Sequence, residues 1–176
     1  MAEAIREAIK GADQILLFRE LGKTEKATKL MFQTEHSVER SLDGGDSVAT
    51  KDGSISSPGT AEIELPFSSI MARGDECYEM LLDCFENNKT VEVWAIDKGA
   101  EPKESGEATK YPAKYMQGKL TDFSETANAE DMMELEGTIS VNGIPQSGDA
   151  TLSVEQAQVV QYAFKDTTVE DAGAEV

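Results

Sequence analysis

Strict alternation of apolar and polar residues is the feature that most constrains the fold of this sequence. The clearest stretch runs from Met133 to Val141, where apolar residues or glycine occupy every second position and polar residues lie between them. Successive side chains of a β-strand point to opposite faces of a sheet, so this period predicts a strand with one buried and one hydrated face. Similar patterns, or apolar runs of strand length, predict further strands over residues 14–19, 30–39, 61–69, 91–96 and 111–126. We therefore expect a mainly β protein.

One stretch shows the helical period instead. Between Glu76 and Asn87 the apolar residues recur at intervals of three and four, and Asp75 in front of them is a good N-cap. This spacing predicts one packed α-helix with Leu81, Leu82 and Phe85 fully buried. The same stripe contains Tyr78, Met80, Cys77 and Cys84. On a helix the two cysteines lie about 10 Å apart, too far for a disulfide, so both should be reduced.

The segment from Asp43 to Gly59 interrupts the strands. It is rich in Gly, Ser, Asp and Thr, and Val48 and Ile55 are its only large apolar residues. Loops of this length are uncommon in compact domains and are usually functional or disordered. We expect this long inter-strand loop to be mobile in the free subunit and to become fixed only against a neighbouring molecule.

The ends of the chain are expected to lie outside the main sheet. Residues 2–10 predict a short helix in an N-terminal arm over residues 1–11. A linker rich in Gly, Ser and Asp follows Asn142 and Gly143. Ser153 and Gln156 then match a capping box, which predicts a turn of helix leading into a strand up to residue 165. Residues 1–165 would form a single domain, and the acidic residues 166–176 a disordered tail.

The formal charge of −18 limits the partners of the chain. An acidic excess of this size repels a phosphate backbone, so the composition excludes a protein that binds a nucleic-acid groove. The longest purely apolar run, from Ile15 to Phe18, is far shorter than the ~20 residues of a membrane span, and no secretory signal opens the chain. We expect a soluble protein made in a cytoplasm, with no membrane partner.

Residues that perform chemistry are scarce. His36 is the single histidine, so neither a multi-histidine zinc site nor a paired imidazole mechanism is available. Glu134 and Glu136 are two residues apart on one strand face, which suits acid–base catalysis but is also the ordinary pattern of a hydrated face. We expect no catalytic residues, no cofactor, no metal and no enzyme activity.

Two segments resemble a known family when they are read together. The first runs from Tyr115 to Gly143 and contains the turn SETANAED; the second runs from Gly148 to Thr167 and contains VVQYAFKD. Both are similar to the major tail (tail tube) proteins of long-tailed, non-contractile phages of Gram-positive bacteria. The upstream order of elements, with a strand, a long Gly/Ser loop and a single helix after the third strand, is similar as well.

The resemblance implies an antiparallel β-sandwich with one packed helix, six copies of which close into a ring. It also implies that the inner sheets join into a β-barrel and that rings stack into the tail tube, through which DNA passes without sequence-specific binding. The implied partners are a tape measure protein and the tail terminator or distal tail proteins. The implied location is the virion, after assembly in the host cytoplasm.

The alternation within each strand shows which residues face away from the core, and the resemblance suggests which of these could line or stack a tube. The lumen-lining candidates, which alternate with core-facing residues, are Glu35, Glu39, Glu62, Glu64, Glu134 and Glu136. The ring-stacking candidates in the long loop are Asp43, Asp46, Val48, Asp52 and Ile55. A wall of carboxylates would repel phosphate and keep a duplex from adhering. The sequence leaves one alternative open, a monomeric acidic binding module that mimics DNA in a basic groove of another protein.

Overall fold

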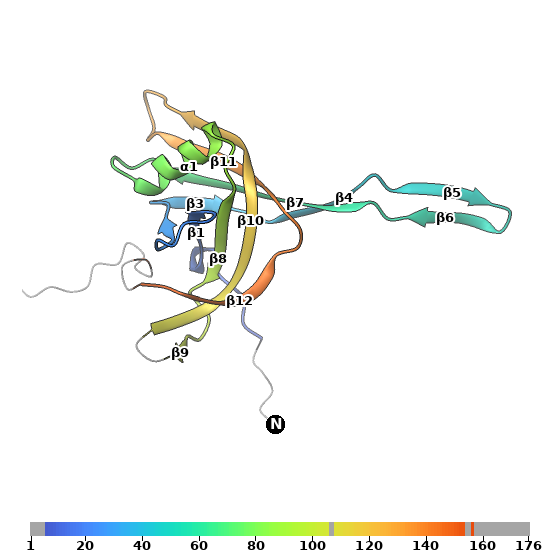
Figure 1. The fold of residues 1–176 in the computed structure, drawn as a ribbon, viewed down its shortest axis with the longest axis horizontal. Helices are drawn as coiled ribbons and strands as arrows, with labels where there is room; N and C mark the ends of the chain where they lie inside the picture. Colours follow the sequence, from blue (N-terminus) through green and yellow to red (C-terminus); the bar gives the residue numbers. More distant parts are fainter. Residues whose placement is uncertain (1–5, 106–107, 154–155, 157–176) are drawn as a thin grey trace, which may run out of the picture.

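Ten strands form one curled antiparallel sheet in the part of the chain that the structure describes, and two more form a separate hairpin (Figure 1). The computed structural model describes residues 6–105, 108–153 and 156. A short 3-10 helix, η1 (Gly11–Asp13), precedes the sheet, and one α-helix, α1 (Glu76–Glu86), lies between β7 and β8. The strands are β1 (Gln14–Glu20), β2 (Thr28–Lys29), β3 (Gln33–His36), β4 (Glu39–Asp43), β5 (Asp46–Thr50), β6 (Gly53–Ser57), β7 (Thr60–Ile70), β8 (Val91–Asp97), β9 (Lys103–Ser105), β10 (Ala108–Thr126), β11 (Glu134–Val141) and β12 (Gln146–Thr151). The predicted mainly β class with one packed helix is confirmed.

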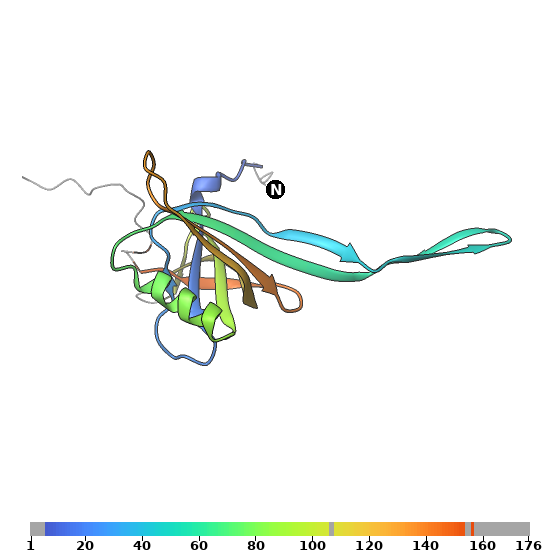
Figure 2. The same ribbon diagram turned by 90° about the horizontal axis from the view of Figure 1, so that it is seen from above.

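The long strand β10 organises the sheet. Its first part pairs with β12 over residues 110–115 and with β8 up to Gly118, and its second part pairs with β11 over residues 118–126. The strand curves between these parts, so the sheet bends over on itself into a half-barrel (Figure 1 and Figure 2). We call β1, β8, β12 and the first part of β10 the β1 layer. The second part of β10 forms the β7 layer with β11, β7, β3 and β4.

The main core lies between the two layers. Phe18 of β1 and Phe67 of β7 meet there with ring centroids 5.3 Å apart, and both are buried. The other large side chains that are almost completely buried in this cluster are Leu16, Leu30, Leu65, Leu81, Met116, Leu135 and Ile139. Most of them come from the alternating positions of the predicted strands, so burial of one strand face drives the packing of the layers.

A glutamine side chain ties the two layers together at the open side of the half-barrel. The Gln33 amide of β3 accepts a hydrogen bond from the Leu16 N–H at 2.9 Å and donates one to the Leu16 carbonyl at 2.7 Å. The amide thereby satisfies both backbone groups of this residue in β1, as a neighbouring strand would do.

The helix α1 begins and ends close to the predicted residues. The Asp75 carboxylate accepts a hydrogen bond from the Cys77 N–H at 2.9 Å and caps the helix. The fully buried stripe consists of Cys77, Leu81 and Cys84, spaced i, i+4 and i+7. Burial raises the pKa of Cys77 to about 12 and that of Cys84 to about 11, so both remain protonated thiols.

The expectation that Leu82 and Phe85 are fully buried is wrong. Leu82 is half-buried, and Phe85 is 40% exposed. Cys77, Leu81 and Cys84 form the stripe that faces the core, so Leu82 and Phe85, which lie beside this stripe, reach only the margin of the core. There the Phe85 ring stacks on Phe123 of β10, with ring centroids 6.1 Å apart.

We expect Leu81→Ala to destabilise the subunit by about 2–5 kcal/mol, because this fully buried side chain leaves a cavity when it is truncated. Leu82→Ala should cost less than half as much, since part of the Leu82 side chain already contacts water. Urea unfolding of the two variants measures both losses. A larger loss for Leu82→Ala would show that the helix buries a different face.

The strand predicted over residues 30–39 begins later than expected and is divided into two strands, β3 and β4. A turn at residues 30–32 separates β2 from β3, and a gap at residues 37–38 separates β3 from β4. Pro66 of β7 lies opposite this second gap. A proline has no N–H to donate, and here no residue of β3 or β4 needs that hydrogen bond. Because the turn at residues 30–32 interrupts the alternation, Phe32 is exposed although the pattern predicts that it faces the core.

Two more segments differ from the prediction. The linker expected after Gly143 contains β12, which pairs with β10 although most of its side chains are exposed. Backbone pairing alone makes this segment a strand, so hydropathy could not indicate it. Residues 6–10 are exposed and not helical, since a short helix without a packed face is unstable in water.

The capping box at the C-terminal end is confirmed. The Ser153 N–H donates to Gln156 Oε1 at 3.2 Å, and the Gln156 N–H donates to Ser153 Oγ at 3.3 Å. The strand expected up to residue 165 and the acidic tail over residues 166–176 lie outside the described residues. In the described ranges no helix has the length and apolar character needed to cross a membrane.

Candidate functional site

The face of the β7 layer that points away from the core carries the carboxylates selected by strand parity. The register places Glu136 opposite Ser68, and Ser68 opposite Glu35, so these side chains share one face. The alternate residues of the same strands, such as Leu135 and Phe67, are buried on the other face. All six lumen candidates are exposed on this surface, which we call the acidic face: Glu35, Glu39, Glu62, Glu64, Glu134 and Glu136.

Two of these carboxylates oppose each other across neighbouring strands. Glu39 of β4 lies opposite Glu64 of β7, and directly opposed like charges destabilise a sheet. The same row continues through Ser140 to Lys119, which lies two strands away from Glu64. Within the described residues no ion pair includes any of the six carboxylates. A charge pattern that weakens the isolated subunit indicates a role outside it.

A bulge in β10 adds a carboxylate that the sequence analysis missed. The register with β11 shifts between Leu120 and Asp122, so Asp122 lies opposite Thr138 on the acidic face. The same shift turns Phe123 towards α1 and the core, whereas strict alternation places it on the face opposite Met116. One feature of the sequence could have indicated the bulge. Leu120 and Phe123 are both apolar but three residues apart, and an uninterrupted strand would place them on opposite faces.

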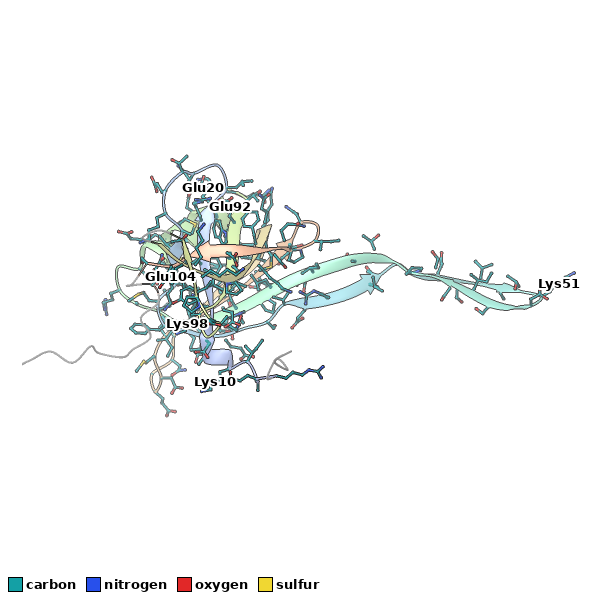
Figure 3. All side chains as sticks on the ribbon, turned by 90° about the horizontal axis from the view of Figure 1, so that it is seen from below. Lys10, Glu20, Lys51, Glu92, Lys98 and Glu104 are labelled. Carbon is teal, nitrogen blue, oxygen red and sulfur yellow. The ribbon has the colours of Figure 1, made fainter. Side chains whose placement is uncertain are left out.

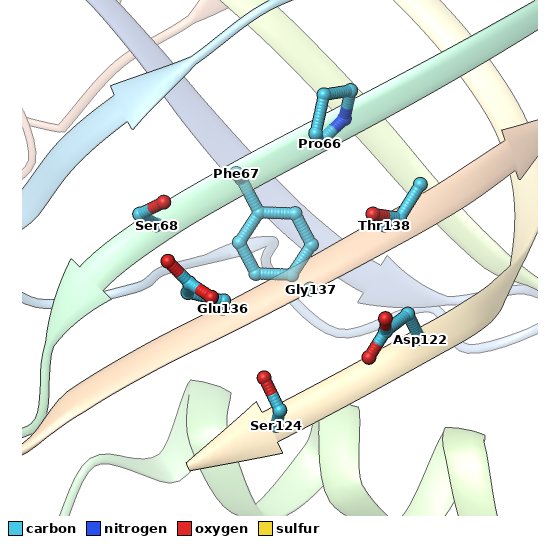
Figure 4. Close-up of a pocket in the computed structure, with 8 residues that line it drawn as sticks. All are labelled: Pro66, Phe67, Ser68, Asp122, Ser124, Glu136, Gly137 and Thr138. Atoms are coloured by element: carbon cyan, nitrogen blue, oxygen red, sulfur yellow. The ribbon is translucent and has the colours of Figure 1, made fainter. Parts of the chain in front are cut away.

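A shallow hollow of about 240 Å³ lies in the acidic face at this bulge (Figure 4). Asp122 and Glu136 line it together with the hydroxyl side chains of neighbouring strands. The Phe67 ring packs against Gly137, where a Cβ would lie 2.5 Å from the ring. No cluster of three or more potential metal ligands occurs in the residues that the structure describes. The hollow is therefore a depression in a surface rich in carboxylates.

The β7 layer ends in two open edges. β4 pairs with β7 on one side, and none of the described strands pairs with its other side. At the opposite end of the layer, β8 leaves β10 at Gly118, so residues 119–126 pair with β11 on one side only. Open edges of this kind are templates for strands of another chain.

The register of β4 determines which backbone groups this edge offers. The Ser37 N–H donates to the Pro66 carbonyl at 3.0 Å, so even-numbered residues of β7 direct their backbone groups towards β3 and β4. Ser41 lies opposite Glu62 and is therefore in the hydrogen-bonded position. The next residue, Leu42, directs its N–H and carbonyl to the open edge.

Residues 43–59 form an extended arm. β5 and β6 pair from Asp46 opposite Ser57 to Thr50 opposite Gly53. This hairpin projects away from the sheet, with Lys51 at its tip (Figure 1 and Figure 3). The long inter-strand connection is present, but its backbone is a paired ribbon where the sequence suggested an irregular loop. The ribbon satisfies its own backbone groups while all its side chains in β5 and β6 stay exposed.

The arm carries one apolar spot. Val48 lies directly opposite Ile55, and both side chains are exposed. Of the other stacking candidates, Asp46 begins β5 and Asp52 lies in the turn at the tip, whereas Asp43 ends β4 at the base of the arm. An exposed cross-strand apolar pair gains further stability when another surface covers it.

The outer surface of the β1 layer holds a partly buried ion pair. Arg19 Nε lies 2.7 Å from Glu92 Oε2, and the Tyr115 hydroxyl donates to Glu92 Oε1 at 2.5 Å. The Arg19 guanidinium lies 4.9 Å from the centre of the Trp94 ring. Burial raises the pKa of Tyr115, and the hydrogen bond to Glu92 raises it further. These contacts join β1, β8 and β10 and stabilise the layer that supports the acidic face.

The half-barrel, the arm and the single helix together define the fold of a tail tube subunit. The structure matches the SPP1 tail tube with a TM-score of 0.73 and 20% identity, over 93% of this chain and 96% of that one. It matches the tail of a gene transfer agent particle with a TM-score of 0.60 and 10% identity, over 79% and 98%. The match to the sheath–tube complex of an extracellular contractile injection system has a TM-score of 0.53 and 11% identity, over 84% and 95%.

The sequence comparisons identify the family. Residues 8–147 match the phage tail tube protein family. A tail protein of Staphylococcus phage phiMR25 is 34% identical over 163 residues, which cover 91% of this chain and 83% of that protein. The chain belongs to the phage tail tube protein family. The resemblance noted in the sequence is confirmed, and the protein is a structural component of a phage virion.

Proposed function

We propose that six copies of this protein close into a ring, that rings stack into the tail tube, and that the acidic face lines the channel for DNA. The observation that carries the proposal is that one layer holds both open edges and the acidic face. A subunit with two open edges at opposite ends of one sheet is suited to join with copies of itself.

Ring closure would pair β4 of one copy with residues 119–126 of β10 in the next. The joined β7 layers would then form a continuous barrel, and closure would remove the exposed edges that favour aggregation. The core, α1 and the β1 layer all lie on the other side of the β7 layer. Because the core, α1 and the β1 layer are too large to fit inside the barrel, they would lie outside it and the acidic face would face the lumen. The C6 symmetry named for the gene transfer agent tail supports a ring of six.

The charge of the acidic face suits a conduit. Double-stranded DNA carries one negative charge per ~1.7 Å of its axis, so carboxylates on the wall keep it away from the protein surface. A duplex held off by repulsion moves with little friction. The contacts with a tape measure protein and with tail terminator or distal tail proteins belong to the ends and the interior of such a tube.

Electron microscopy of the purified protein tests the proposal. We expect rings with six-fold symmetry and tubes of stacked rings, formed by the protein alone or with its tail assembly partners. If only small particles form under all these conditions, the proposal is contradicted and the acidic binding module becomes the better explanation.

A proline at the open edge of β4 tests how the ring closes. Leu42→Pro removes an N–H that points away from β7, so the subunit should unfold at nearly the parent temperature. Because this N–H is offered to the next copy, the variant should fail to close rings in electron micrographs. Leu42→Ala removes the side chain but keeps the N–H, and it should form rings like the parent. Normal rings from Leu42→Pro would show that β4 does not pair between copies.

A further inference from the structure

The end of the subunit opposite the arm carries a second exposed apolar surface. Phe32, between β2 and β3, is 51% exposed, and Met132, before β11, is 70% exposed. Met31 and Met133, the neighbours of these residues, are exposed as well. We call these four residues the methionine rim. They come from two turns that are far apart in the sequence.

Backbone hydrogen bonds hold both turns of the rim against the end of β7. The Ile70 N–H donates to the Phe32 carbonyl at 3.1 Å, and the Met71 N–H donates to the Met133 carbonyl at 2.9 Å. Ile70, the last residue of β7, and the following Met71 thus bind one turn each, which places both turns at the same end of the sheet. The rim is therefore a built part of the fold.

The turn at Phe32 is held in an unfavourable conformation. Phe32 has a φ of +51°, in the left-handed region that large side chains rarely adopt. The Met31 N–H donates to the Asp75 carboxylate at 2.9 Å, and the same carboxylate caps α1. A strained backbone and an exposed aromatic ring at the same residue both lower the stability of the isolated subunit. A strained residue that stays exposed points to a contact with another molecule.

We infer that the methionine rim receives the arm of a second copy of this chain. This inference rests on the proposed stacking of rings. β7 runs from the base of the arm at Thr60 to the rim at Ile70, so the two surfaces lie at opposite ends of one strand (Figure 1). Two different surfaces at opposite ends form a head-to-tail contact that repeats without limit. Contact between two rims would instead stop growth after two layers.

The chemistry of the two surfaces is complementary. The Val48–Ile55 pair is an apolar spot small enough to enter a cluster of methionine side chains, which adapt their shape to a partner. The arm contains two aspartates and one lysine between residues 46 and 57, so it is almost neutral in a chain of charge −18. The rim is flanked by Glu130, Asp131 and Glu134, which repel acidic surfaces and favour the approach of Lys51 at the arm tip.

Paired cysteines test which surfaces meet. In assembled tubes the double variant Val48→Cys/Phe32→Cys should form a ladder of disulfide-linked multimers on oxidation, since each copy would link to the copies before and after it. Each single variant should stay monomeric under the same oxidation. Cys77 and Cys84 are buried thiols and should not react. Dimers from a single variant, or no ladder from tubes of normal length, would overturn the inference.

A substitution at Phe32 tests the rim without adding cysteines. Asn tolerates positive φ, so Phe32→Asn should keep or raise the unfolding temperature of the subunit. It should raise the protein concentration needed for tube formation by about tenfold or more, as the loss of a central aromatic contact does. The control Leu21→Asn removes an exposed side chain elsewhere and should polymerise at the parent concentration. Tubes from Phe32→Asn at the parent concentration would overturn the inference.

The outcomes separate this inference from the proposed function. Parent tubes with six-fold rings, together with a failed cysteine ladder, would contradict the contact between arm and rim alone. If the parent forms no rings or tubes, the proposed function fails and the inference fails with it.

Discussion

Removing the arm should produce a subunit that folds and closes rings but makes no long tubes. Deleting Asp46–Ser57 removes a complete hairpin and leaves four residues, Gly44, Gly45, Pro58 and Gly59, to connect Asp43 with Thr60, which are already paired. Connections of this length are ordinary in hairpins. The deleted strands bury no side chain and the shorter loop changes closure entropy only slightly, so the unfolding temperature should stay close to that of the parent.

Electron microscopy and thermal unfolding measure these two properties. A milder variant, Val48→Ser/Ile55→Ser, keeps the hairpin but removes its apolar pair, and it should also shorten the tubes. In the parent, amide hydrogen exchange in the arm should be slower in tubes than in free subunits. The stacking role would be refuted by deletion variants that form tubes of parental length, or by equal exchange rates in the two states.

Reversing the charge of the acidic face should slow or block DNA ejection. In phage that carry lysine at Glu62, Glu64 and Glu136, the proposed lumen would attract phosphate instead of repelling it. Tube length should stay normal, because these side chains lie on an exposed face and make no core contact. The rate of DNA release from purified particles, with tube lengths from electron micrographs, measures both effects.

Matched variants decide whether position or total charge matters. Lysine at the exposed helix residues Glu76, Glu79 and Glu86 also makes the subunit less acidic, but these residues lie on α1, outside the acidic face. Those particles should eject DNA at the parental rate. Raising the salt concentration should partly restore ejection in the lysine variants, because ions screen the attraction. Parental ejection from the variants of the acidic face would contradict the lumen assignment.

Local pattern was enough to group the candidate residues of the acidic face. In β7 and β11 the alternation continues without interruption around Glu62, Glu64, Glu134 and Glu136, so parity alone places these side chains opposite the core. The N-cap at Asp75 and the capping box at Ser153 were predictable for a similar reason. Their partners lie within three residues, and the hydrogen bonds are local.

Pattern failed where a distant strand determines the backbone. The bulge after Leu120 depends on the register with β11, and it moves Asp122 onto the acidic face. β12 is a strand because β10 pairs with it, although its own residues are mostly polar. Within α1 the spacing predicts an apolar stripe, but the depth of Leu82 and Phe85 depends on where the sheet approaches the helix.

Residue pattern alone indicated the mainly β class, the single helix, the family and six of the carboxylates that share a face. Each of these depends on residue identity or on spacing within one element. Three features became visible in the folded chain: the acidic face lies between two open edges, the segment at 43–59 is a paired arm, and two distant turns form the methionine rim. The physical reason is that these features arise from hydrogen bonds between strands, and the partner of a strand is not encoded in its own period.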